Sequence, residues 1–144
     1  MVTAADIDGW ASFSALHARS RVEIRVTIGT ADNMRPPTYW FRRTIKSPEQ
    51  NLQIAQTDTR ACPALLPALH SLEALPTAQP IVPFLDSQDM IVTADGVEYS
   101  ITVPAAYSDA SADDMTLKSN VNTPLAGWIE ATLMTLEGCI SKKR

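Results

Sequence analysis

Residues 21–28, RVEIRVTI, alternate between polar and apolar side chains. In an extended chain the even-numbered positions, all Val or Ile, project to one side, and the odd-numbered Arg, Glu and Thr residues project to the other. This period of two is typical of a strand that buries one face and exposes the other. The stretch therefore predicts a half-buried β-strand.

Helical spacing precedes this strand and recurs twice after it. A helix is predicted over residues 4–18 by apolar side chains in steps of three, namely Ile7, Trp10, Phe13 and Leu16. A second helix is expected over residues 63–75, where Pro67 should kink the helix or delay its start. A third is expected over residues 124–137, with Gly138 as its C-cap.

The remaining regular stretches predict further strands and one hairpin. Strands are expected at residues 38–46, 52–57, 90–94, 97–103 and 115–119. Asp95-Gly96 lies between two of them, and a two-residue Asp-Gly loop is a strong hairpin signal. This hairpin would pair Val92 with Tyr99 and Met90 with Ile101. The polar stretch 104–114 is interpreted as a loop.

Taken in order, these elements give α-βββα-βββα. The expected fold class is α+β, with antiparallel strands in one or two sheets and the helices packed on one face. We expect a single domain over residues 1–144, in which a proline-rich connector at 76–83 joins two βββα-like halves. Aligning Pro63 with Pro124 suggests a weak internal repeat.

Composition bounds the class of protein. The chain has 144 residues, 45% of them hydrophobic and 19% charged, which suits a folded domain with its own core. Its longest uncharged runs are broken by proline and too short for a membrane span. A formal charge of −4 argues against general nucleic-acid binding. Residues 1–60 hold eight Lys or Arg and six Asp or Glu, whereas residues 61–144 hold four and ten.

The two cysteines allow two interpretations. Cys62 precedes the second predicted helix and Cys139 follows the third, so antiparallel packing of these helices would bring the thiols within disulfide reach. We expect this disulfide, which places the protein in the periplasm or the secreted space. The alternative is a pair of buried thiols in a cytoplasmic protein. Residues 1–8 do not resemble a signal peptide, so the first interpretation requires a mature form whose signal peptide has been removed.

A basic, aromatic strand face is one candidate binding site. Trp40, Arg42 and Lys46 alternate to one side of their strand, and Arg21 and Arg25 alternate along the neighbouring one. If these residues share a face, cations surround a tryptophan, an arrangement that holds sugars, acidic peptides or single strands. The simpler interpretation is a solvated face balanced by a glutamate, with the indole covered by the first helix. Arg43 falls on the apolar side and must reach the rim or a carboxylate.

The loops that enter the second and third helices are another candidate. Helix N-termini suit anions, and Arg60, Lys118 and Asn120 could supplement them. The alternative is that the loop residues are ordinary caps, namely Asp58, Thr59, Asn122 and Thr123.

No motif for catalysis, a metal or a cofactor is assembled. His17 and His70 belong to no recognisable catalytic pattern, and the acidic residues do not have calcium-loop spacing. We therefore expect no cofactor and no metal, and a small non-catalytic protein that binds a macromolecule, either a protein or an envelope polymer. The rival interpretations are a cytoplasmic acidic chaperone or adaptor, and a small hydrolase.

Overall fold

The computed structural model of this chain describes residues 9–29, 37–76, 78, 80, 82, 84, 85, 96–105 and 113–141. The start of the first predicted helix, the predicted strand at 90–94, most of the loop at 104–114 and part of the connector at 76–83 lie outside these residues. The parts of these predictions that fall on the other residues stay predictions.

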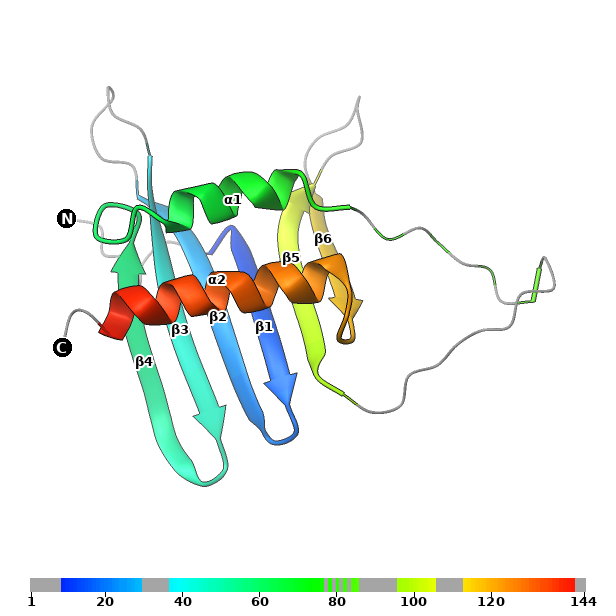
Figure 1. Cartoon of the computed structure of the whole chain (residues 1–144), viewed down its shortest axis with the longest axis horizontal. Helices are drawn as coiled ribbons and strands as arrows, with labels where there is room; N and C mark the ends of the chain where they lie inside the picture. Colours follow the sequence, from blue (N-terminus) through cyan, green and yellow to red (C-terminus); the bar gives the residue numbers. More distant parts are fainter. Residues whose placement is uncertain are drawn as a thin grey trace.

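Six antiparallel strands form one sheet in the order β4-β3-β2-β1-β5-β6 (Figure 1). The strands are β1 (Ala11–His17), β2 (Ser20–Gly29), β3 (Thr38–Ser47), β4 (Gln50–Asp58), β5 (Glu98–Ala105) and β6 (Asp113–Ser119). The five that were expected at 21–28, 38–46, 52–57, 97–103 and 115–119 are confirmed within a few residues at each end. The α+β class is confirmed as well.

The predicted helix over residues 4–18 is wrong where the structure describes it, because Ala11–His17 is strand β1. Its inward residues Ala11, Phe13 and Ala15 are buried, so the true period is two. Two of these three residues are alanine, which carries little apolar signal, and Trp10 and Leu16 imitate helical spacing. Within the described residues the element order is therefore ββββα-ββα, and the internal repeat is not confirmed.

The hairpin pairing predicted for Tyr99 and Ile101 is also wrong. Both residues lie in β5, where Tyr99 pairs with Ala15 on one side and Ser119 on the other. The two edges of β5 are thus occupied by β1 and β6 at these residues, and no edge is left for a strand at 90–94. The loop predicted at 104–114 is shorter than expected, because its first two and last two residues belong to β5 and β6.

Two antiparallel helices, α1 (Leu65–Glu73) and α2 (Pro124–Ser141), lie across the same face of the sheet (Figure 1). Pro67 stands in the first turn of α1, where no backbone N–H is needed, so the proline delays the helix rather than kinking it. The prediction that Gly138 caps α2 is wrong. Gly138 lies inside the helix, because the last turn continues to Ser141 and buries Ile140.

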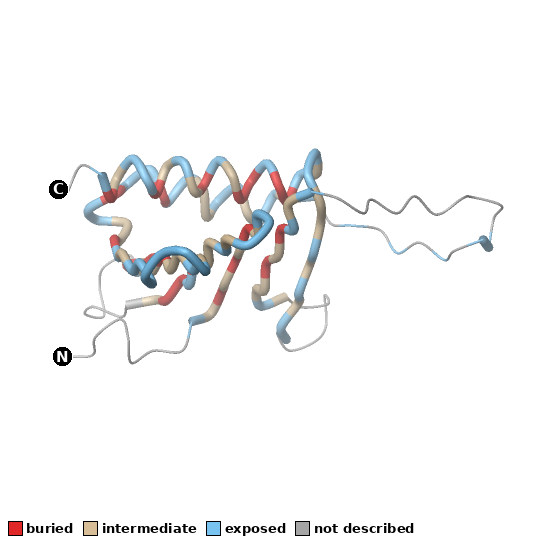
Figure 2. Tube along the Cα trace, turned by 90° about the horizontal axis from the view of Figure 1, so that it is seen from below, coloured by how far each residue is buried: buried red, intermediate tan, exposed pale blue. Residues whose placement is uncertain are grey.

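The core lies between the sheet and α2, and the edge-on view shows a layer of helices over a layer of strands (Figure 2). Trp128 of α2 packs edge-on against Phe13 of β1, with ring centroids 5.0 Å apart. Its indole N–H donates to the Ala68 carbonyl and the Ser71 hydroxyl of α1, which fixes the two helices together. Ile24, Phe41 and the other buried apolar side chains complete this layer, namely Leu65, Ile101, Leu125, Ile129 and Leu136.

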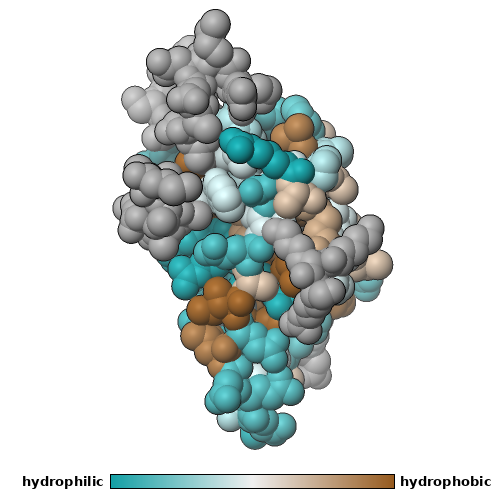
Figure 3. Space-filling model, turned by 90° about the vertical axis from the view of Figure 1, so that its left-hand side faces the viewer, coloured by the Kyte–Doolittle hydropathy of each residue, from teal (hydrophilic) through white to brown (hydrophobic). Residues whose placement is uncertain are grey.

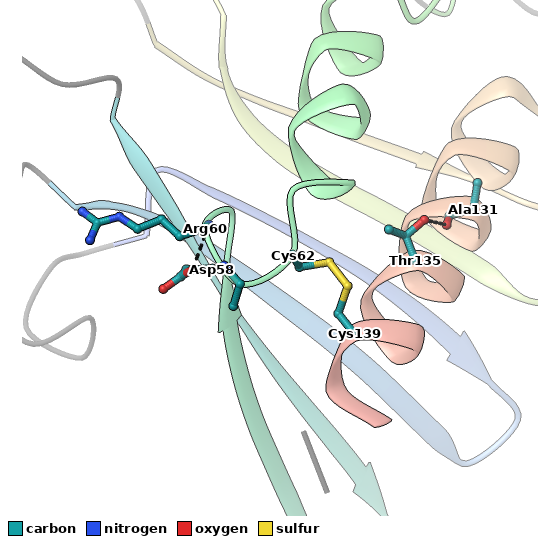
Figure 4. The surroundings of a disulfide bond; sticks show 7 residues. Asp58, Arg60, Cys62, Ala131, Thr135 and Cys139 are labelled. Carbon is teal, nitrogen blue, oxygen red and sulfur yellow. Dashed lines mark hydrogen bonds between the residues drawn. A yellow bond between two sulfur atoms is a disulfide. The ribbon is translucent and has the colours of Figure 1, made fainter. Parts of the chain in front are cut away.

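A disulfide joins Cys62, in the turn before α1, to Cys139, in the last turns of α2 (Figure 4). The two Cα atoms are 5.8 Å apart and the residues are separated by 77 positions in the sequence. The predicted bridge is confirmed, and so is the antiparallel helix packing from which it was predicted. Cys139 lies within the helix, however, and not after it.

Candidate functional site

The face of the sheet opposite the helices carries the predicted basic residues. Arg21, Arg25, Arg42 and Lys46 alternate with buried residues on β2 and β3, so all four side chains project to the open face. Arg21, Arg25 and Lys46 are exposed, and Arg42 is half-buried. The structure thus brings together the four cations that the sequence pattern placed on one face; whether they bind a partner remains a prediction.

The strand register places like charges directly opposite one another. Arg25 pairs with Arg42, and Arg21 pairs with Lys46, while Glu23 lies opposite Thr44 between these two pairs. Like charges at directly opposite positions destabilise a sheet by a few tenths of a kcal/mol or more. The face therefore keeps an arrangement that costs stability when nothing neutralises it.

No carboxylate in the described part of the chain forms an ion pair with these cations, although Glu23 lies between the two pairs on the same face. The ion pairs there are His17–Glu130 and Arg43–Glu137, and neither involves the open face. Arg42 Nε is buried without an acceptor. Gly9 packs closely against the stem of Arg25, because a Cβ atom on this glycine would lie 2.5 Å from Arg25 Cγ. Arg25 and Arg42 therefore lie at opposite positions of neighbouring strands without an ion-pair partner among the described residues.

The basic side chains border a shallow hollow of about 240 Å³ at the β4 side of the open face. Its lining is mixed, and consists of Glu23, Arg25, Arg42, Thr44, Lys46, Leu52 and Ile54. Leu52 and Ile54 belong to the edge strand β4 and are 57% and 49% exposed. Figure 3 looks at this side of the molecule and shows an apolar patch surrounded by hydrophilic side chains. We call these seven residues the basic hollow.

Trp40 lies on the same face, next to the basic hollow along β3. It pairs with Thr27 on β2 and Asp58 on β4 and is half-buried. The sequence suggested that the first predicted helix would cover this indole. That interpretation is wrong within the described residues, because strand β1 replaces the helix there. Trp40 therefore stands beside the cations, as the binding interpretation requires.

The structure does not bring Arg60 and Lys118 together, since they lie at opposite edges of the sheet. Arg60 follows β4, and its Nε donates to the Thr38 hydroxyl at 2.9 Å (Figure 4 shows its side chain pointing away from α1). Lys118 lies on β6 opposite Ser100 and projects to the open face, away from the N-terminus of α2. The Asn120 carbonyl accepts a hydrogen bond from the Thr123 hydroxyl.

Capping explains part of the polar character of the two loops. Thr123 Oγ1 accepts the Ala126 N–H at 3.1 Å in the first turn of α2, so the predicted cap is confirmed there. Asp58 instead closes the turn after β4, where it accepts the N–H groups of Arg60 and Ala61. The N-cap of α1 is Ala64, which has no side-chain hydrogen bond.

Arg43 lies under α2 among apolar neighbours and forms an ion pair with Glu137 of that helix. The sequence pattern required a carboxylate partner for this residue, and the structure supplies one.

A second polar cluster joins β1, β5 and α2. Tyr99 is buried and its hydroxyl donates to Glu130 Oε1 at 2.6 Å, while His17 Nε2 lies 3.7 Å from the same oxygen. Burial, followed by the hydrogen bond and the charge of Glu130, raises the pKa of Tyr99 to about 12. A hydrolase would need a nucleophile beside such a base, and no serine or cysteine hydrogen-bonds to His17, Tyr99 or Glu130 among the described residues.

The described residues also lack two kinds of feature. None of their His, Cys, Asp or Glu side chains gather in a group of three or more that could hold a metal ion. None of the helices that they form is long and apolar enough to cross a membrane.

Comparisons with protein-family models, with curated proteins and with solved structures gave no significant match.

Sequence reasoning missed the apolar part of the basic hollow. Leu52 and Ile54 alternate along β4 and were assigned to a strand, but their exposure depends on β4 being an edge strand. Edge position follows from long-range pairing, which a local pattern does not contain.

Proposed function

We propose that this protein is a non-catalytic binding protein of the bacterial envelope or the secreted space, and that its open sheet face holds an acidic segment of another protein. The observation that carries the proposal is the pair of like-charge matches, Arg25 with Arg42 and Arg21 with Lys46, without a carboxylate partner in the described residues. An acidic partner would remove this repulsion by pairing its carboxylates with the cations of the face.

The apolar side of the basic hollow favours a protein segment over a uniformly charged polymer. Leu52 and Ile54 offer apolar area next to the cations, and both are about half exposed. A peptide that alternates acidic and apolar residues could cover both kinds of surface along the edge strand, as in other peptides that lie beside a sheet edge. A phosphate polymer would leave the two aliphatic side chains uncovered.

The disulfide supports the proposed compartment. Bridges of this kind persist in oxidising environments and are rare in the cytosol. The cytoplasmic adaptor alternative requires both thiols to be reduced, whereas the structure joins Cys62 to Cys139.

The test uses a fluorescein-labelled peptide of alternating Glu and Leu residues, titrated with the full chain and followed by fluorescence anisotropy. Arg42→Gln should weaken binding by about tenfold or more, because a desolvated charge contact is lost. Lys118→Gln removes one charge from the same face at the far edge strand, and we expect it to change Kd by about twofold at most. Higher salt should weaken binding by the wild-type chain.

A double variant gives the decisive comparison. Trp40→Ala with Arg42→Ala should abolish capture of the peptide, and its melting curve is recorded to verify that the half-buried positions still support cooperative unfolding. Retained capture would contradict the assignment of this face. Tighter binding of polyglycerol phosphate than of the peptide would contradict the choice of a protein partner and favour an envelope polymer.

A further inference from the structure

A second hollow lies on the helix side of the sheet, beneath α1. It has a volume of about 390 Å³, within the range of sites that hold small molecules. Side chains of α1 form its roof, and the ends of β5 and β6 together with Trp10 and Tyr39 form its floor and wall. We call it the α1 cleft. Because it lies on the opposite face from the basic hollow, it is independent of the proposed function.

The lining of the α1 cleft is mainly apolar and incompletely packed. Leu69, Leu72 and Leu75 have the spacing of a core stripe, yet all three are only half-buried, and Leu65 is the buried residue of α1. On the sheet the lining continues with Ile101, Val103, Met115 and Leu117. Burying such area stabilises a complex by roughly 25 cal/mol for each Å². The cleft thus offers apolar surface that a ligand could cover.

Trp10 supplies a buried hydrogen-bond donor of this lining that lacks a partner in the described chain. Its indole Nε1 is buried and has no hydrogen-bond acceptor. The indole of Trp128 shows the usual arrangement, since its N–H has two acceptors. A buried donor without an acceptor destabilises the folded chain. Nε1 itself has almost no solvent-accessible surface, so a turn of the Trp10 side chain toward the cleft is needed before a ligand oxygen accepts its N–H and removes that destabilisation.

The charges of the lining restrict the class of ligand. Its titratable side chains are Tyr39, His70 and Glu73, and neither Lys nor Arg contributes to it. A carboxylate or phosphate would therefore meet Glu73 without a cation to offset the repulsion. The volume suits about a dozen non-hydrogen atoms, if each takes roughly 30 Å³. We propose that the α1 cleft binds a neutral, mostly apolar small molecule whose hydroxyl or carbonyl oxygen accepts the hydrogen bond of Trp10 Nε1.

The three tryptophans provide a direct readout of this binding. The chain contains Trp10, Trp40 and Trp128, so a ¹H–¹⁵N spectrum of the full chain should show three indole N–H signals. We use 1-decanol as the probe. Its addition should move the Trp10 indole signal downfield, as a new hydrogen bond does, and leave the Trp40 signal in place because Trp40 lies on the other face.

Matched variants separate the hydrogen bond from apolar burial. Trp10→Phe keeps an aromatic wall but removes the donor, and it should weaken decanol binding by about tenfold. Trp40→Phe is the control and should bind decanol like the wild type. Affinity is measured by displacement of the neutral fluorophore N-phenyl-1-naphthylamine, and each variant's melting temperature is recorded so that loss of folding is recognised.

Three outcomes would overturn the proposal. The first is an unchanged Trp10 signal at saturating decanol. The second is equal affinity of the wild type and a folded Trp10→Phe variant. The third is tighter binding of decanoate than of decanol, which would contradict the neutral class of ligand.

Discussion

Arg43 is a charged residue in the middle of an apolar layer. Its side chain is 6% exposed and lies between Ile24 and Ala55 of the neighbouring strands, whereas its partner Glu137 is 48% exposed. Removing water from a guanidinium costs several kcal/mol unless a partner and hydrogen bonds compensate. The ion pair therefore holds α2 to the sheet at a position where an unpaired charge would be strongly unfavourable.

We expect Glu137→Gln to be more destabilising than Arg43→Met. The first change leaves a buried cation without its counter-charge and should lower the free energy of unfolding by about 1–3 kcal/mol, less than for a fully buried pair because Glu137 is half exposed. The second replaces the cation with an apolar side chain. Urea denaturation measures both, with Glu49→Gln as an exposed control. The prediction fails if Glu137→Gln costs no more than the control.

Tyr99 makes stability depend on alkaline pH. Its pKa is raised to about 12 in the folded chain, and an unfolded tyrosine has a pKa of about 10. The folded state therefore retains the proton that the unfolded state loses, and the contribution of this residue, present below pH 10, should disappear as the pH rises to 12. The loss should amount to about 2–3 kcal/mol.

The control for this pH dependence is Tyr99→Phe, which cannot ionise. Its free energy of unfolding should fall less steeply between pH 10 and pH 12 than that of the wild type. Equal slopes for the two proteins would contradict the proposed cause.

At the scale of elements, local patterns predicted most of the sheet but not its connections. The alternation in β2 and β3 identified the strands and the face on which the cations lie, because a period of two requires no knowledge of partners. Strand β1 was not predicted from the sequence because its buried positions are mostly alanine. The pairing of β5 with β1 joins segments far apart in the sequence, and no local pattern indicates such a partner. The Asp95-Gly96 pattern favoured a neighbouring segment as the partner instead.

The same distinction explains the candidate sites. Arg42 and its neighbours were found because charge and strand period are visible in the sequence. The α1 cleft was not, because it depends on how closely α1 packs on the ends of β5 and β6. The disulfide could be predicted because Cys62 precedes one predicted helix and Cys139 follows another. Antiparallel packing of two such helices brings these ends together.

At the scale of the whole molecule, the charge asymmetry of the sequence becomes an asymmetry across the sheet. Arg21, Arg25, Arg42, Arg43 and Lys46 lie on β2 and β3, whereas Glu98, Asp113 and Asp114 lie on β5 and β6 toward the other edge. Such a distribution orients an acidic partner as it approaches, and salt weakens the effect.

The disulfide is expected to carry a large share of the stability. Closing a loop of this length stabilises the folded state by about 4 kcal/mol in the chain-entropy model. Reduction should therefore lower the midpoint of urea unfolding, and the Cys62→Ser variant should match the reduced protein. Intact mass after alkylation provides the complementary measurement: under denaturing conditions neither thiol should react until reductant is added. Immediate alkylation of both thiols would contradict the bridge and favour the cytoplasmic adaptor.

The bridge between Cys62 and Cys139 also determines how the protein responds to backbone cleavage. The covalent ring that it closes contains α1, β5, β6 and most of α2, while β1–β4 lie outside. A protease that cuts once within this ring, for example in the proline-rich connector, leaves both fragments on one molecule. The nicked protein should migrate as a single species on a non-reducing gel and separate into two bands only after reduction. In an environment rich in secreted proteases, one such cut would not release any strand of the sheet.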